Sequence, residues 1–150
     1  MKVRRATPAD DAAIADLFAV YAKEFAHNLG AQDVVGEGRH AREYYGGNVF
    51  VADHGGRVLG CVAFEPWTPP RCRMKRMIVH PDGRGRGFGR MLAEAALQEA
   101  TVAGYTEMCL DTTKPMVAAT ALYRSLGFEE FTADYEALCN DVFYLRRDLA

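Results

Sequence analysis

The sequence predicts one α/β domain, of the α+β kind, in which helices pack on a mixed sheet. Segments with strand and helix periodicity alternate along the chain in the order β-α-α-β-β-β-α-β-α-β-β. Apolar residues make up 49% of the 150 residues, enough for one substantial core. No linker, internal repeat or low-complexity stretch divides the chain. We therefore expect a single domain over residues 1–150.

The first third of the chain is expected to be mainly helical. A short strand over residues 2–6 leads into a helix whose N-cap is Thr7. Apolar side chains recur along that helix at helical spacing and mark a buried face: Ile14, Leu17, Phe18, Tyr21 and Phe25. A second helix is expected over residues 33–45, although Gly36 and Gly38 disfavour it.

The middle of the chain is expected to form three strands. Residues 49–53 and 58–64 read as a hairpin, because His54-Gly55-Gly56 between them is a turn signal. A proline-rich break at residues 66–70 separates the hairpin from a third strand over residues 72–79.

The second half is expected to add two helices and three strands. One amphipathic helix begins within residues 85–89 and ends before Gly104, which suits the position after a helix end. Another runs from Thr112 to about residue 126, where Gly127 stops it. The strands are expected at residues 107–110, 128–131 and 142–149.

Composition excludes several classes of protein. A formal net charge of -2 disfavours a nucleic-acid scaffold. No apolar run approaches the roughly 20 residues that span a membrane, and the N-terminal segment lacks an apolar signal core, so we expect a cytoplasmic protein without membrane contact. The cysteines are far apart and without metal-ligand spacing, which predicts buried reduced thiols and no metal site: Cys61, Cys72, Cys109 and Cys139.

A glycine-rich turn, Arg84-Gly85-Arg86-Gly87-Phe88-Gly89, lies between a strand and an amphipathic helix. The first turn of a helix offers free backbone N–H groups, and glycines let a phosphate approach the backbone closely. The spacing fits neither a Walker loop nor a dinucleotide-binding fingerprint, and an RGG-like RNA tract would not open an apolar-faced helix. An anion site is therefore expected, with a tight turn that binds no ligand as the alternative.

Two segments carry a family resemblance. Ile78-Val79-His80-Pro81-x-x-Arg84-Gly85-x-Gly87-x-Gly89-Arg90-x-Leu92 resembles the acetyl-CoA signature of the GNAT superfamily, and residues 121–128 resemble its late helix-to-strand segment. The resemblance implies a mixed, mostly antiparallel sheet of six to seven strands flanked by about four helices. It also implies an acetyl-CoA-dependent N-acetyltransferase in which the strand before the loop splays from its neighbour.

The same resemblance implies site residues by position. The strand backbone at three residues would contact the pantetheine arm, and the loop would hold the pyrophosphate. The cofactor-binding residues implied are Met77, Ile78, Val79, Arg84, Gly85, Arg86, Gly87, Phe88, Gly89 and Arg90. Tyr123 would be the general acid for the departing thiolate, because a phenol near pKa 10 is protonated at neutral pH; the alternative is a core aromatic. Met116 stands where many members have Asn.

The general base stays open. Arg73 occupies the position where family members often have Glu, which leaves Glu65 and Asp111, both at strand ends, as candidates. Each carboxylate could instead be merely solvated or structural. His80 precedes a proline in the loop, and a structural role is expected for it.

For the acceptor side, the sequence offers only residue types as evidence. Strand alternation puts Arg71, Arg73 and Lys75 on one face and Arg76 on the other, so a basic face could bind an acidic group of the acceptor. Alternatively, this face is only solvated. Three aromatic side chains are further candidates for lining the acceptor side: Trp67, Tyr44 and Tyr45.

The sequence therefore predicts acetyl transfer from acetyl-CoA to a primary amine of a small molecule or amino-acid-like acceptor, directly within a ternary complex. The alternatives are a catalytically silent acetyl-CoA-binding regulatory module, an acetyltransferase for protein or peptide amines, and a nucleic-acid or phosphoprotein binder that uses the basic patch. A homodimer is left open.

Overall fold

A computed structural model describes residues 2–26, 29, 32–131 and 142–149 of the chain. Its strands form one sheet in the order β1-β2-β3-β4-β5-β7-β6. All neighbouring pairs are antiparallel except β4 and β5, which are parallel. The expected mixed, mostly antiparallel sheet is confirmed. The strands are β1 (Lys2–Arg5), β2 (Val49–His54), β3 (Arg57–Pro66), β4 (Arg71–Val79), β5 (Glu107–Thr113), β6 (Glu129–Phe131) and β7 (Val142–Asp148).

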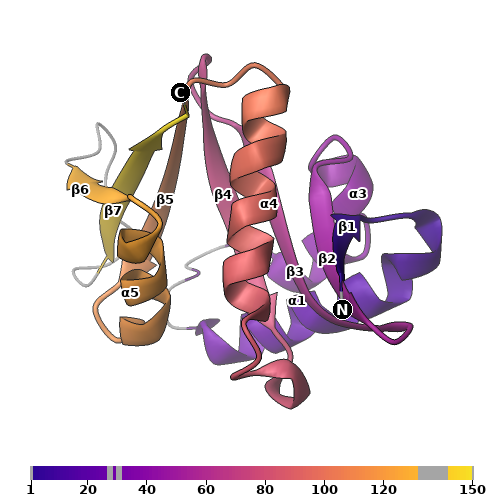
Figure 1. Ribbon diagram of the computed structural model, residues 1–150. Helices are drawn as coiled ribbons and strands as arrows, with labels where there is room; N and C mark the ends of the chain where they lie inside the picture. Colours follow the sequence, from indigo (N-terminus) through magenta and orange to yellow (C-terminus); the bar gives the residue numbers. More distant parts are fainter. Residues whose placement is uncertain (1, 27–28, 30–31, 132–141, 150) are drawn as a thin grey trace.

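Helices cover both faces of the sheet (Figure 1). One face carries α4, and the other carries α1 with α2 and α3. Each face has its own apolar core, because residues of β2 alternate between them: Phe50 faces the α4 side and Val51 the α1 side. The helices are α1 (Asp11–Glu24), α2 (Val34–Gly38), α3 (Ala41–Tyr44), α4 (Phe88–Val102) and α5 (Val117–Ser125), with 3-10 turns η1 (Pro8–Asp10) and η3 (Pro81–Gly83).

Residues 33–45 form the two short helices α2 and α3 in place of the single helix expected. The glycine at the end of α2 explains part of the difference, since a Cβ on Gly38 would lie 2.5 Å from the Cβ of Phe18. Glycine lets α2 approach α1 closely at this point, at the cost of helix propensity.

The expected helix start at Thr112 is wrong. Thr112 and Thr113 continue β5 and pair with Phe143 and Val142 of β7, and α5 begins only at Val117. Strand pairing with a distant segment overrode the local helix signal.

The expectation of buried thiols is confirmed for three cysteines, and Cys139 lies outside the described residues. No helix within the described residues is both long and apolar enough to cross a membrane.

A β-bulge interrupts β4 at Arg76. Cys61 lies opposite Ile78, whereas Ala63 lies opposite Lys75, so β4 has one residue more than β3 between these two pairs. Arg76 has a φ of 56°, in the left-handed region that few residues other than glycine adopt.

The bulge turns the side chain of Arg76 to the same face as that of Lys75, where both line one cavity. The expectation that Arg76 points to the opposite face is therefore wrong, because one extra residue shifts the alternation that follows it.

Strands β4 and β5 pair only at their beginnings. Their ladder comprises Arg71–Glu107, Cys72–Met108 and Arg73–Cys109, and then stops. Residues 74–79 of β4 and 110–113 of β5 continue without pairing to each other. The splay implied by the family resemblance is present.

Candidate active site

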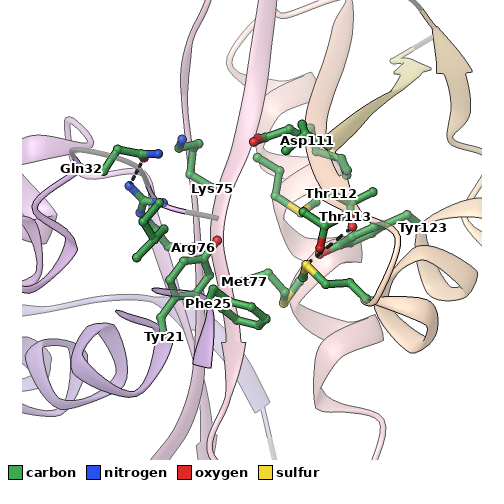
Figure 2. Close-up of a pocket in the computed structure, with 15 residues that line it drawn as sticks. Tyr21, Phe25, Gln32, Lys75, Arg76, Met77, Asp111, Thr112, Thr113 and Tyr123 are labelled. Atoms are coloured by element: carbon green, nitrogen blue, oxygen red, sulfur yellow. Dashed lines mark hydrogen bonds between the residues drawn. The ribbon is translucent and has the colours of Figure 1, made fainter. Parts of the chain in front are cut away.

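A cleft opens where β4 and β5 diverge. Its walls come from distant parts of the chain: Met77 from β4, Thr112 from β5, Tyr123 from α5, and Tyr21 and Phe25 from α1 and its C-terminal end. Figure 2 shows these side chains around one space between the two strands. Because no strand among the described residues pairs with this edge of β4 beyond Arg73, its backbone groups can bind a ligand in the cleft.

The glycine-rich turn lies at the end of β4. Its first part is built by His80, whose Nδ1 accepts a hydrogen bond from the N–H of Asp82 at 3.0 Å. This contact supports the structural role expected for His80. Gly85 and Gly87 have φ values of 79° and 83°, and Gly87 is the N-cap of α4.

Backbone N–H groups at the start of α4 lack acceptors within the helix, because no helical residue lies four positions earlier. A Cβ built on Gly85 or Gly87 would meet no atom of the described residues within 4 Å, so among them the space beside the turn is open. Free amides, open space and a positive helix end suit a phosphate group.

The arginines of the turn have different surroundings. Arg84 donates to the carboxylate of Glu24 at 2.5 Å and to the carbonyl of Val79 at 3.0 Å, so its guanidinium joins α1 to the end of β4. Arg86 and Arg90 are exposed. Phe88 is buried in the core, which leaves only its backbone available to a ligand.

Tyr123 lies in the wall of the cleft on α5 and is 5% exposed. Its ring packs edge-on against Phe128, and Gly127, with a φ of 94°, ends the helix between them. Burial raises the pKa of the Tyr123 phenol above its ordinary value. Its hydroxyl has no hydrogen-bonding partner within residues 2–26, 29, 32–131 and 142–149, and it points into the cleft (Figure 2).

The two candidate bases differ in their partners. Glu65 lies opposite Arg73 across the β3–β4 ladder, and the Arg73 Nε donates to its carboxylate at 3.0 Å. Asp111 on β5 is exposed and lines both the cleft and a second, outer pocket. Within the described part of the chain, Asp111 accepts no hydrogen bond and forms no ion pair. Of the two candidate bases, Asp111 is therefore the one whose carboxylate has no partner among the described residues.

The outer pocket joins the cleft on the α2 side of the sheet. Its walls include Glu37, His40 and Tyr44, together with residues of β3, β4 and β5. Tyr44, one of the three aromatic candidates, therefore lines this pocket. Tyr45 is buried and donates its hydroxyl to the Glu37 carboxylate.

Three of the four cations of β4 have partners within the protein. Arg71 stacks over the ring of Trp67 at 4.3 Å, and Trp67 lines neither cavity, contrary to expectation. Arg73 pairs with Glu65 as described above, and the Arg76 Nε lies 2.9 Å from the carboxylate of Glu37.

Of the four cations of this strand, only Lys75 has no ion pair, hydrogen bond or ring contact with the described residues. The sequence predicts only that Lys75 belongs to a basic strand face. The bulge and the ion pairs of Arg73 and Arg76 are what distinguish Lys75 from the other cations.

Other lining residues escaped sequence reasoning. Helical spacing predicts only a buried helix face for Tyr21 and Phe25, and the sequence pattern does not mark Gln32. Tyr21 and Phe25 reach the cleft because α1 packs beside β4, a relationship that carries no local signal. Met116 also lines the cleft, with its sulfur 3.8 Å from the Thr112 hydroxyl.

A splayed pair of parallel strands, a glycine turn before a helix and a buried tyrosine define the class of acyl-CoA-dependent acetyltransferases. A family model described as acetyltransferase (GNAT) domain matches residues 45–130. An uncharacterized N-acetyltransferase of Schizosaccharomyces pombe is 36% identical over 135 residues, which cover 87% of this chain and 83% of that protein.

Two further comparisons agree. Human N-acetyltransferase 8B is 36% identical over 86 residues, 54% of this chain but only 38% of that protein, so the chain matches well under half of this relative's length. The structure of yncA, an acetyltransferase from Salmonella typhimurium solved with its cofactor acetyl-CoA, has a TM-score of 0.77 and 25% identity, and the match covers 100% of this chain and 94% of that one.

This chain belongs to the GNAT acetyltransferase family. Membership confirms the expected fold, and with it the expected enzyme class, an acetyl-CoA-dependent N-acetyltransferase.

Proposed function

We propose that the chain, as a single domain over residues 1–150, transfers an acetyl group from acetyl-CoA to the primary amine of a small molecule or amino-acid-like acceptor. The observation that carries this proposal is the end of the β4–β5 ladder at Arg73 and Cys109. Beyond it, the free edge of β4 faces a cleft that also holds the hydroxyl of Tyr123 and leads to a separate outer pocket.

The donor half fits acetyl-CoA. The free backbone edge at Met77, Ile78 and Val79 would bind the amides of the pantetheine arm. The turn at the start of α4 would hold the pyrophosphate through its amides, with residues 84–89 and Arg90 contributing. The open space at Gly85 and Gly87 agrees with this assignment. Arg84 contributes mainly by fixing the turn, since its guanidinium already binds Glu24 and Val79.

Direct transfer requires the protein to polarise the thioester carbonyl and to protonate the departing sulfur. Acetyl-CoA supplies an acetyl thioester, whose carbonyl carbon the acceptor amine attacks. Backbone N–H groups on the free edge of β4 would polarise that carbonyl. The Tyr123 hydroxyl would donate its proton toward the sulfur as negative charge develops there. Its raised pKa keeps the phenol protonated at neutral pH.

Asp111 is the stronger candidate for the general base, and Glu65 the weaker. Asp111 lies on the wall shared by the cleft and the outer pocket, where donor and acceptor would meet. Glu65 also lines the outer pocket, but its carboxylate is already held in an ion pair with Arg73.

The proposal is tested by calorimetry with acetyl-CoA followed by a coenzyme A release assay over a panel of small primary amines. Binding with turnover of small amines is the expected result. Tight binding without turnover of any small amine, peptide or protein would instead indicate a regulatory module. Turnover of peptides alone would move the acceptor to protein amines, and absence of acetyl-CoA binding would overturn the proposed donor site.

A further inference from the structure

Lys75 and Asp111 occupy equivalent places on adjacent strands. Arg73 and Cys109 are the last directly paired residues of β4 and β5, and Lys75 and Asp111 each follow two positions later. Because side chains alternate along a strand, both project to the same face as that pair. Figure 2 shows the two side chains on opposite sides of one end of the cleft.

Both side chains line the cleft and the outer pocket. They therefore stand at the junction where, on the proposed function, the acetyl donor meets the acceptor. An acceptor that reaches the thioester from the outer pocket must pass between an amine and a carboxylate.

The two arginines of β4 beside this junction are already paired. Arg73 binds Glu65, and Arg76 binds Glu37, each through a direct ion pair. Lys75 and Asp111 form no ion pair with each other or with any other residue in the described ranges. The junction thus presents one unpaired cation and one unpaired anion, separated by a gap.

Half-burial makes an unpaired Lys75 unfavourable. Desolvation lowers the pKa of its amine, and the charge of neighbouring Arg76 lowers it further, while Asp111 acts in the opposite direction. A carboxylate placed beside Lys75 would offset both effects.

We infer that the acceptor is a zwitterion, a free α-amino acid or close analogue, whose carboxylate binds Lys75 while its amine faces Asp111. An α-amino acid carries an ammonium and a carboxylate on one carbon. One such molecule can therefore give Lys75 and Asp111 a counter-ion each. This inference rests on the proposed function and adds the substrate class.

These residues account for every proton transfer of the reaction. The bound ammonium gives one proton to Asp111, which passes it to solvent, and the neutral amine then forms the amide bond to the acetyl carbon. The carbon–sulfur bond breaks, and coenzyme A leaves as its thiol with a proton from Tyr123. The phenol recovers that proton from the acylated nitrogen through solvent. Lys75 keeps its charge throughout and acts only in binding.

The test uses matched trios: each α-amino acid, its primary amide and the amine that lacks the carboxyl group. Coenzyme A release gives kcat/KM for the wild type, Lys75→Met, Lys75→Arg and a control, Lys23→Met, which removes an exposed lysine of α1. Calorimetry with acetyl-CoA and a melting curve show whether each variant is folded with its donor site intact.

The wild type should prefer the best acid over its amide by roughly 10- to 100-fold, the range expected for a hydrogen-bonded charge pair. Lys75→Met should remove this preference by lowering kcat/KM for the acid, mainly through KM, while leaving the amide within about threefold. Lys75→Arg and Lys23→Met should keep it.

Equal wild-type turnover of acids, amides and amines would overturn the zwitterion inference and leave the proposed function standing. An equal loss of kcat/KM for acid and amide in a folded Lys75→Met protein would also overturn the zwitterion inference. Because the wild-type preference is itself decisive, the inference is testable even where Lys75→Met does not fold. Absence of turnover for the whole panel would overturn both the inference and the proposed small-molecule acceptor.

Discussion

The guanidinium of Arg76 and the carboxylate of Glu37 form a buried ion pair, with 2.9 Å between Nε and Oε1 and side chains that are 4% and 7% exposed. The pair joins the bulge in β4 to α2, one wall of the outer pocket. The Tyr45 hydroxyl and the Gln32 side chain complete its hydrogen bonds. The pocket's shape therefore depends on a strained backbone position that this pair holds in place.

Glu37→Gln should destabilise the fold by about 3 kcal/mol, because it leaves the buried charge of Arg76 without a counter-ion. Urea unfolding followed by circular dichroism measures the change. Glu94→Gln, on the exposed side of α4, is the matched control and should stay within about 0.5 kcal/mol of the wild type. Equal midpoints for the two variants would contradict a structural role for the pair.

Gly87→Glu should weaken acetyl-CoA binding at least about tenfold more than Gly87→Gln. Both side chains strain the left-handed φ equally, but only glutamate brings a negative charge to the proposed pyrophosphate site. Calorimetry at low and high salt measures the effect, and the difference between the variants should shrink as salt screens the charge. Equal affinities of the two variants for acetyl-CoA would contradict a pyrophosphate site at this turn.

Tyr123→Phe should lower kcat by about 10- to 100-fold while the Kd for acetyl-CoA stays within about twofold. Burial raises the pKa of the Tyr123 phenol, so the phenol stays protonated as the pH rises. Deprotonation of Tyr123 should therefore not lower wild-type kcat at any pH up to about 10. Tyr105→Phe, at a tyrosine that packs on Phe64 away from the cleft, is the control. Unchanged kcat in Tyr123→Phe would exclude the tyrosine from the mechanism.

Asp111→Asn should lower kcat/KM by about 100-fold, and Glu65→Gln by less than about tenfold. The order follows from their partners, since Glu65 is held by Arg73 and Asp111 is unpaired within the described residues. Steady-state kinetics on the best amine measures both. The reverse order would make Glu65 the base.

At pH 8, a colorimetric disulfide reagent should titrate at most one thiol per folded chain, and four after unfolding. Burial raises the pKa of Cys61, Cys72 and Cys109 to about 12, so the reactive thiolate is scarce well below that pH. A low background would also make the same reagent suitable for following coenzyme A release. Rapid titration of two or more thiols in folded protein would show that these cysteines are accessible.

Much of the fold could be predicted because its signals are local. Period-2 and helical patterns gave the order of strands and helices, and Gly104 and Gly127 marked helix ends that the structure confirms with φ values of 96° and 94°. The failures lie where distant segments meet. Thr112 has the local appearance of a helix start, yet it pairs with Phe143 of β7.

By itself, the sequence predicted the donor half of this protein, because a glycine turn between a strand and a helix is a continuous motif whose own backbone can bind a phosphate group. Only the tertiary structure decided the acceptor half. Arg71, Arg73, Lys75 and Arg76 look alike in the sequence, and their different roles depend on which distant group each one meets. An extra residue in β4, detectable only against its pairing with β3, turns Arg76 inward. Lys75 is left unpaired, opposite Asp111, where β4 and β5 separate. The ion pairs that distinguish the other cations from Lys75 act through space rather than along the chain.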